Sequence, residues 1–271
     1  MKKRTAVIAA LVSLLPMGQP LVIGTGTVLT SAAVMLSIPE KVQAESAVFY
    51  YNRGIDKYDA GNYYGAISDY SKAIEINPRY AKAYYNRGLA KRKLGDNYGA
   101  IADYSKSIEI DPRYADAYNN RGNAKNDLKD YSGAISDYSK AIEINPRYAK
   151  AYYNRGTIKG RYLEDYDGAI SDYSKSIEIN PRYADAYINR GIAKDELKDY
   201  YGAIADYNKA IEINPRDAKA YNNRAQTRYI LGDMKGSCTD AKKAASLGSE
   251  ESKRILSGSI GAEICGSSIN H

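Results

Sequence analysis

The chain has 271 residues, of which 44% are hydrophobic and 26% are charged, close to the averages of globular proteins. It holds 28 tyrosines, one phenylalanine and no tryptophan, so a core must use tyrosine as its large residue, with a partner for each buried hydroxyl. Residues 1–44 carry four basic residues and one acidic residue, so the formal charge of +7 falls to +4 over the rest. The remaining charges are interspersed, which argues against a continuous phosphate-binding stripe.

Residues 1–44 have the pattern of a secretory leader. Basic residues 2–4 precede an apolar stretch over residues 6–38, and the small residues Val42 and Ala44 follow at the spacing of a cleavage site. We expect cleavage after Ala44 and export to the periplasm or another extracytoplasmic compartment. The 18-residue segment 21–38 is long enough to remain as a membrane anchor, and a cytoplasmic product is the third alternative. No cysteine lies near the cleavage site, which disfavours a lipoprotein.

Residues 45–251 form an array of internal repeats. The sequence Ala-Lys-Ala-Tyr-Tyr-Asn-Arg-Gly begins at Ala81, and related versions begin in five other places. They define six units, over residues 47–80, 81–114, 115–148, 149–183, 184–217 and 218–251. Each unit has 34 residues except the fourth, which has one more near Tyr162, where we expect a lengthened turn. A fixed period of this size is typical of solenoid proteins.

Each unit predicts a helical hairpin. In the second unit, apolar spacing indicates one helix over residues 82–94 and another from about Tyr98 until Pro112 stops it. One hairpin cannot bury its own apolar face, so we expect the next hairpin to stack on it. Gly88 and Ala100 are small where the two helices must approach closely, although the last unit has alanine at the glycine position.

The units resemble the tetratricopeptide repeat. That family has an aromatic residue at position 4 of the unit, glycine at 8, alanine at 20, an aromatic residue at 24 and proline at 32. The second unit has Tyr84, Gly88, Ala100, Tyr104 and Pro112 at these positions. The resemblance implies an all-α, right-handed superhelical solenoid of six hairpins. Positions 7 and 11 depart from the family pattern because both carry basic residues.

An arginine and an aspartate recur together in all six units. The arginine is at position 7, in the first helix: Arg53, Arg87, Arg121, Arg155, Arg190 and Arg224. The aspartate is early in the second helix: Asp69, Asp103, Asp137, Asp172, Asp206 and Asp240. We expect an ion pair between the two helices of each hairpin, which helps to fix their register.

The resemblance also implies a binding groove, because in this family the first helices line the concave surface. The candidate groove residues are Tyr51, Asn52, Lys82, Tyr85, Asn86, Arg92, Asn120, Lys150, Tyr153, Asn154, Arg161 and Asn189. An amide both donates and accepts, so a ladder of asparagines can grip a peptide backbone. Tyrosine rings add contact area at low entropic cost.

These features predict a non-catalytic scaffold that binds a peptide or protein partner, for example as an assembly factor of an exported or membrane complex. Two alternatives remain at this stage. The groove asparagines and tyrosines could serve only to stabilise the hairpins, or the tyrosines and lysines could bind single-stranded RNA. The carboxylate clamp of the family's co-chaperones is absent, because its lysine and arginine positions carry other residues.

Residues 252–271 follow the array. Residues 250–256 predict a short capping helix, and residues 257–271 predict an irregular tail. Cys238 and Cys265 are the only cysteines, and in an exported chain we expect a disulfide between them. A metal site that uses both cysteines and His271 is the alternative. His271 is the only histidine, so no nucleophile–histidine–acid set is possible elsewhere, and we expect no enzyme activity and no cofactor.

Overall fold

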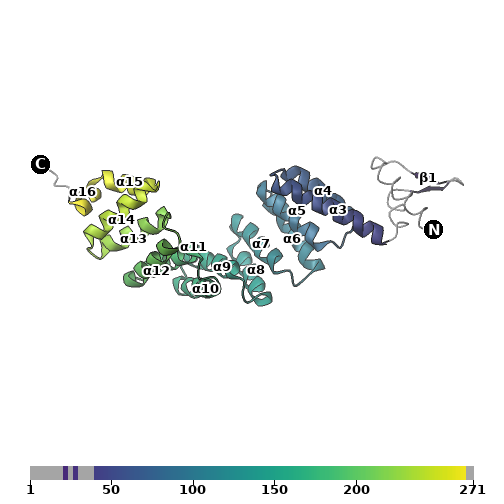
Figure 1. Cartoon of the computed structure of the whole chain (residues 1–271). Helices are drawn as coiled ribbons and strands as arrows, with labels where there is room; N and C mark the ends of the chain where they lie inside the picture. The colour runs from purple at the N-terminus through teal and green to yellow at the C-terminus, as the bar shows by residue number, and fades with distance from the viewer. Residues whose placement is uncertain (1–20, 24–26, 30–39, 267–271) are drawn as a thin grey trace. The chain divides into compact units, whose positions relative to one another are not determined.

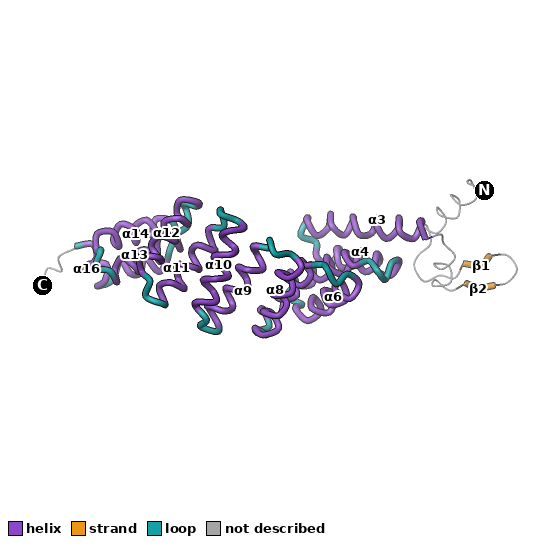
Figure 2. The backbone as a smooth tube through the Cα atoms, turned by 90° about the horizontal axis from the view of Figure 1, so that it is seen from below, coloured by secondary structure: helices purple, strands orange, loops and turns teal. Residues whose placement is uncertain are grey.

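The computed structural model describes residues 21–23, 27–29 and 40–266, and the array consists of paired helices (Figure 1). The helices are α3 (Glu40–Asp59), α4 (Tyr63–Ile76), α5 (Ala81–Lys93), α6 (Asn97–Ile110), α7 (Ala115–Asp127), α8 (Tyr131–Ile144), α9 (Ala149–Tyr162), α10 (Tyr166–Ile179), α11 (Ala184–Glu196), α12 (Tyr200–Ile213), α13 (Ala218–Ile230), α14 (Met234–Ser246), α15 (Glu250–Ser257) and α16 (Ser259–Cys265). This is the predicted all-α repeat solenoid, with consecutive helices alternating as first and second members of each hairpin (Figure 2). The chain forms two compact units, a first unit of residues 1–124 and a second unit of residues 125–271, and each of the six 34-residue sequence units is from here on called a repeat.

The leader contains two short strands rather than a described helix. Strands β1 (Leu21–Ile23) and β2 (Thr27–Leu29) pair antiparallel, with Val22 opposite Val28. The rest of the predicted anchor segment 21–38 lies outside the described residues. Among the residues that are described, no helix is long and apolar enough to span a membrane. Ala44, the predicted cleavage point, lies within α3.

The second helix of each hairpin starts at a carboxylate or amide that caps it. In α6, the Asp96 side chain accepts a hydrogen bond from Gly99 N at 2.8 Å, which satisfies one of the unpaired N–H groups at the helix start. A Cβ at Gly99 would lie 2.0 Å from Asp96 Oδ2, so the carboxylate in this orientation leaves no room for a side chain there. Asn62 caps α4 in the same way. The aspartates Asp130, Asp165, Asp199 and Asp233 cap α8, α10, α12 and α14.

The tyrosine at position 24 fills the centre of the hairpins and explains the glycine at position 8. Tyr104 on α6 is fully buried, and a Cβ at Gly88 on α5 would lie 2.7 Å from its ring. The close approach that the sequence indicates is therefore between a helix backbone and a ring. In the last repeat Ala241 replaces the tyrosine, and Ala225 is accommodated at the glycine position.

The extra residue of the fourth repeat lies in a helix, so the predicted lengthened turn is wrong. Helix α9 has 14 residues where α5 and α7 have 13. The bond that closes its last turn runs from Asp165 N to Lys159 O, spanning one residue more than the equivalent bond from Asp96 N to Lys91 O. Helix α9 ends at Tyr162, whose ring stacks on Tyr131 with centroids 4.3 Å apart. The insertion is thus absorbed in the final turn of α9, and its hairpin with α10 stays intact.

The prediction of an irregular tail is also wrong in part. Helix α15 forms where the capping helix is expected, but α16 follows it directly. Ile264 on α16 is 4% exposed and packs against Ala225, Cys238 and Ala241 of the last hairpin. Apolar residues spaced for one helix face thus outweigh the high glycine and serine content. Residues 267–271 lie outside the described part.

Candidate functional site

An ion pair joins the two helices of the hairpins, as the sequence predicts. Arg87 donates from Nε and Nη2 to the two carboxylate oxygens of Asp103, at 2.9 and 2.7 Å. Lys91, one turn further along α5, adds a second ion pair to Asp103 at 2.8 Å. Asp103 is 4% exposed, so a buried charge is paired from two sides. The same pairing recurs at Arg53–Asp69, Arg155–Asp172, Arg190–Asp206 and Arg224–Asp240. In the third repeat, Arg121 belongs to the first compact unit and Asp137 to the second.

The same arginine also makes a hydrogen bond to the preceding repeat, a contact that the sequence does not predict. Arg87 Nη1 donates to Ser71 Oγ on α4 at 3.0 Å, while its guanidinium lies over the Tyr84 ring, 5.4 Å from the centroid. The corresponding bonds run from Arg121 to Ser105, Arg155 to Ser139 and Arg190 to Ser174. One side chain therefore ties together both helices of its own hairpin and the hairpin before it.

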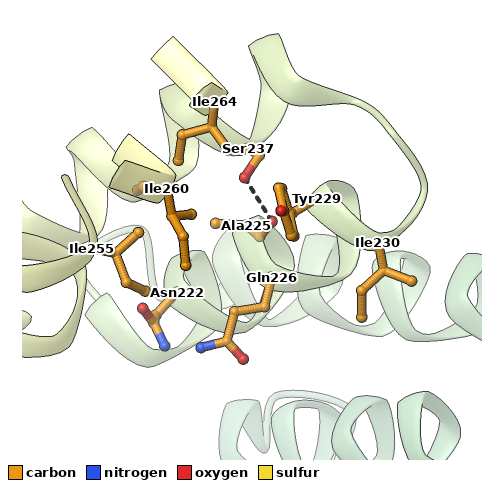
Figure 3. Close-up of a pocket in the computed structure, with 10 residues that line it drawn as sticks. Asn222, Ala225, Gln226, Tyr229, Ile230, Ser237, Ile255, Ile260 and Ile264 are labelled. Atoms are coloured by element: carbon orange, nitrogen blue, oxygen red, sulfur yellow. Dashed lines mark hydrogen bonds between the residues drawn. The ribbon is translucent and has the colours of Figure 1, made fainter. Parts of the chain in front are cut away.

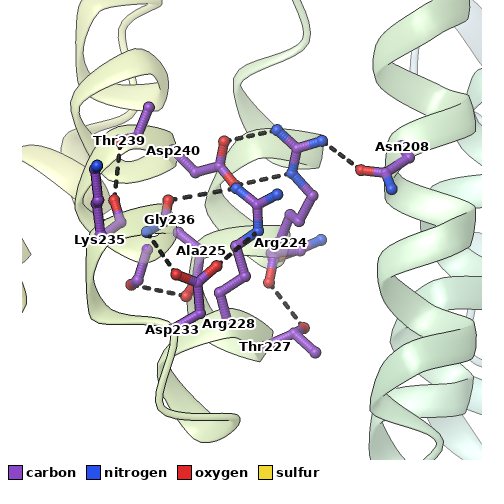
Figure 4. A network of polar contacts seen from close by, with 12 residues as sticks. Asn208, Arg224, Ala225, Thr227, Arg228, Asp233, Lys235, Gly236, Thr239 and Asp240 are labelled. Carbon is purple, nitrogen blue, oxygen red and sulfur yellow. Dashed lines mark hydrogen bonds and ion pairs between the residues drawn. The ribbon is translucent and has the colours of Figure 1, made fainter.

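The last hairpin carries an extended version of this network (Figure 4). Arg224 pairs with Asp240 and donates to Asn208 of the preceding repeat instead of to a serine. Arg228 donates to Asp240 at 2.7 Å and also lies 3.6 Å from Asp233. Asp240 is 2% exposed, so this acid is buried between two guanidinium groups.

Several candidate groove residues bind each other between repeats. Asn86 Nδ2 donates to Tyr51 Oη at 2.9 Å, and Asn120 Nδ2 donates to Tyr85 Oη at 2.9 Å. Asn189 makes the same bond to Tyr153 at 3.0 Å in the second unit. The structure thus gives these asparagines and tyrosines a role between successive repeats, which is close to the alternative in which they only stabilise the hairpins.

The tyrosine rings among the candidate groove residues pack against other tyrosine rings instead of facing solvent. The Tyr51 ring lies between those of Tyr70 and Tyr80, with centroids 5.9 and 4.9 Å away. Burial raises the pKa of Tyr51, against the opposing effect of the hydrogen bond from Asn86. These half-buried rings do not expose open faces, and their hydroxyl groups accept the hydrogen bonds from the asparagines.

Other candidate residues remain at the surface of the first helices. In the first unit Asn52 and Lys82 are exposed and Arg92 is half-buried. Lys82 lies at a cavity of about 370 Å³ that is bounded by Tyr80, Asp111 and Tyr114. A cation, an anion and two phenols therefore meet around one hollow.

The second unit exposes further candidates. Lys150 and Arg161 are exposed on α9, and Asn154 is half-buried. Asp195 on α11 is not a free surface acid, because its Oδ2 accepts hydrogen bonds from Tyr207 Oη at 2.6 Å and Thr227 Oγ1 at 2.8 Å. Burial raises the pKa of Asp195, despite these two bonds. The cationic positions, rather than this acid, are available to a partner.

An apolar pocket of about 230 Å³ lies at the C-terminal end of the second unit (Figure 3). Helices α13 and α14 form one side of it, and Ile255, Ile260 and Ile264 from α15 and α16 form the other. The predicted disulfide joins Cys238 on α14 to Cys265 on α16 and holds α16 in place. The sequence analysis missed this pocket, although the loss of tyrosine at position 24 marks it.

No group of three or more histidine, cysteine, aspartate or glutamate residues that could hold a metal is found among the described residues. His271, which the alternative metal site needs, lies outside the described part of the chain. Both cysteines of that site are in the disulfide.

Comparisons with known proteins return one family. Models described as "Tetratricopeptide repeat" match residues 115–148, 184–217 and 206–236, and a model described as "TPR repeat" matches residues 56–95, 88–127 and 160–194. Together these matches cover well over half of the chain. The comparison with curated proteins returns no match.

Solved structures show the same architecture. A crystal structure of MamA is 30% identical with a TM-score of 0.56, over 61% of this chain and 96% of that one. A structure of PilF from Pseudomonas aeruginosa is 19% identical with a TM-score of 0.69, over 79% of this chain and 98% of that one. YrrB, described as a TPR protein with an unusual peptide-binding site, is 23% identical with a TM-score of 0.57, over 67% and 93%. At their level of identity, PilF and YrrB show the fold alone.

Proposed function

Because the chain belongs to the tetratricopeptide-repeat family, we propose that it is a non-catalytic scaffold that binds a peptide or protein on the faces of its first helices. The observation that carries this proposal is the hollow beside Lys82, where exposed charge and tyrosine hydroxyl groups meet. YrrB, a protein with the same fold, is described as having a peptide-binding site, which supports this choice of partner.

The tyrosine–asparagine bonds between repeats limit which residues can serve the partner. Tyr85 and Asn86 are each engaged with a neighbouring repeat, so they shape the face without being free to grip a peptide backbone. We assign recognition instead to the exposed Asn52 and Lys82 in the first unit, and to Lys150 and Arg161 in the second. Groups of this kind suit acidic or amide-bearing stretches of a partner.

We further propose that the protein acts outside the cytoplasm, as an assembly factor of an exported or membrane complex. The leader pattern of residues 1–44 supports export, and the disulfide between Cys238 and Cys265 supports an oxidising compartment. Cell fractionation with thiol labelling tests this proposal. A full-length product in the cytoplasm with two reactive thiols would contradict it.

A charge-matched pair of variants tests the binding face. Lys82→Glu reverses a charge at the hollow, whereas Lys209→Glu makes the same change on the second helix α12, where Lys209 pairs with Glu212. A photo-crosslinker at position 82 identifies the partner, and titration calorimetry with that partner then gives the affinity. We expect at least a tenfold loss for Lys82→Glu and no change for Lys209→Glu. Equal affinities would place the interface elsewhere.

Single-stranded RNA is the alternative partner, and the structure gives it little support. Stacking on bases needs open ring faces, whereas Tyr51 and Tyr85 are each packed between two other tyrosines. A gel shift with an oligonucleotide at several salt concentrations decides the matter. Tight binding that falls steeply with salt would favour RNA over a protein partner.

A further inference from the structure

The last repeat lacks the tyrosines that fill the other hairpins. In the first repeat, the fully buried Tyr70 at position 24 is surrounded by Tyr51, Ile55, Tyr58 and Ala66, which occupy positions 5, 9, 12 and 20. The second and fourth repeats pack tyrosines at positions 5, 24 and 34 in the same way.

The same positions of the last repeat line the apolar pocket. Asn222, Gln226, Tyr229 and Ser237 are its residues at positions 5, 9, 12 and 20, and Ala241 is at position 24. The positions that surround the ring in the first repeat therefore line the pocket, with more polar side chains at positions 5, 9 and 20, and the ring itself is replaced by a methyl group. Ala225 in place of glycine fits this change, because no ring presses on its helix.

The pocket is held open by fixed elements. The disulfide ties α16 to α14, and Ile264 is buried against the hairpin. Ser252 Oγ donates to Asn222 Oδ1 at 2.7 Å, and Asn222 Nδ2 donates to Glu251 at 3.0 Å, so α15 is bonded to α13. These links fix α15 and α16 against the last hairpin, so that Ile264 fills the space beside Ala241 and the pocket remains open above it.

The mouth of the pocket is accessible and acidic. Gln226 is exposed, and Ile230 and Ile260 at the rim are 56% and 44% exposed (Figure 3). Glu251 accepts a hydrogen bond from Gln226 at 3.1 Å, and Glu263 lies 3.3 Å from the hydroxyl of Tyr229. Two carboxylates thus lie beside an apolar hollow, an arrangement that complements a cation next to an aromatic group.

We propose that this pocket binds an aromatic side chain, tyrosine or phenylalanine, of a partner polypeptide that carries a lysine or arginine beside it. The guest ring enters between Tyr229 on α13 and Ile260 on α16, above the base of the pocket, where Ile264 packs against Ala225 and Ala241. The inference rests on the proposed scaffold function and names the chemistry of one binding site.

The repeat itself supplies a filled-pocket variant. Ala225→Gly with Ala241→Tyr restores the residue pair that the first five repeats carry, and its ring pushes Ile264 from the base of the pocket into the open space. A second variant, Ile260→Glu, places a charge at the rim on an exposed side chain and keeps the test valid if the filled variant fails to fold. Lys209→Glu, on α12 and outside the pocket lining, is the control.

The probes are acetylated and amidated peptides Gly-Lys-Xaa-Lys-Gly, with tyrosine, phenylalanine, leucine or alanine at Xaa, titrated into the full chain and followed by NMR. We expect the tyrosine and phenylalanine peptides to bind at least tenfold more tightly than the alanine peptide, with shifts at Ala225 and Ile264. Both pocket variants should lose this preference. Leucine binding as tightly as tyrosine, or unchanged binding to the variants, would overturn the proposal.

The result is distinguishable from a failure of the scaffold function. If the peptides show no aromatic preference while partner capture still depends on Lys82, only the pocket assignment is wrong. If the aromatic peptides bind the pocket but Lys82→Glu leaves partner capture unchanged, the pocket stands and the first-helix face in the first unit is not the interface.

Discussion

Replacing Gly88 by alanine sets two effects of known sign against each other. Alanine in a helix interior is favoured over glycine by about 1 kcal/mol. The new Cβ, however, would lie 2.7 and 2.9 Å from two ring carbons of Tyr104, where ordinary carbon contacts are about 3.5–4.0 Å. Tyr104 is fully buried and cannot move aside, and such overpacking costs about 1–3 kcal/mol. We therefore expect a net destabilisation of about 1 kcal/mol.

Gly156→Ala is the matched control, because its Cβ would meet its nearest neighbours, on Asp172 and Tyr173, at 3.1 Å. There the two effects should nearly cancel. Repeat arrays can unfold in parts, so amide exchange of α5 and α6 should accompany urea denaturation in the measurement. The reasoning is refuted if Gly88→Ala is as stable as the parent chain, or if both variants lose the same free energy.

Three further outcomes are expected. Arg155→Ala leaves the buried Asp172 paired with Lys159 alone and should lower the free energy of unfolding, measured in urea, by about 2 kcal/mol. Arg53→Ala should lower it less, because Arg53 is 40% exposed. Equal losses would show that the bond from the arginine to the preceding repeat adds nothing. Burial opposes the ionisation of Asp69, but hydrogen bonds from Arg53 and Lys57 outweigh it and lower the pKa of Asp69. The ionised Asp69 therefore stabilises the fold above pH 3.8, and this stabilisation is lost as the pH falls below that value. Asp69→Asn should flatten the acid side of a plot of stability against pH, and an unchanged slope would contradict this. Reducing the Cys238–Cys265 disulfide should destabilise α15 and α16 by about 3–4 kcal/mol in the chain-entropy model. Amide exchange should become faster in these two helices and stay unchanged in α9. Unchanged exchange in all three helices would argue against the prediction.

Three features could be predicted from sequence: the repeat boundaries, the hairpins and the arginine–aspartate pairs. Each depends on contacts within a single 34-residue repeat. The bond from Arg87 to Ser71 could not be predicted, because it joins two repeats. The distance between these two side chains depends on how one hairpin stacks on the next, which the sequence of a single repeat does not specify. The same holds for Asn86 and Tyr51, which the sequence marks as groove residues and which the structure also joins across two repeats.

The end of the array was the hardest part to predict. Helix α16 depends on burying Ile264 against the last hairpin, a contact that local composition does not show. The pocket beside it forms because Ala241 takes the place of a ring and leaves space that α15 and α16 only partly fill. Such a vacancy is visible only when one repeat is compared with another in three dimensions.

The arginine at position 7 gives each repeat two unlike sides. One side presents the guanidinium to the hairpin before it, and the other presents an acceptor on the second helix, which is a serine such as Ser71 or, in the fifth repeat, Asn208. Any repeat with this pair matches any other, so a duplication or deletion of one hairpin would recreate an existing interface instead of needing a new one. The length of such an array can therefore change during evolution in whole hairpins. The first repeat, whose Arg53 pairs with Asp69, and the disulfide-bound α16 after the last repeat would stay as they are.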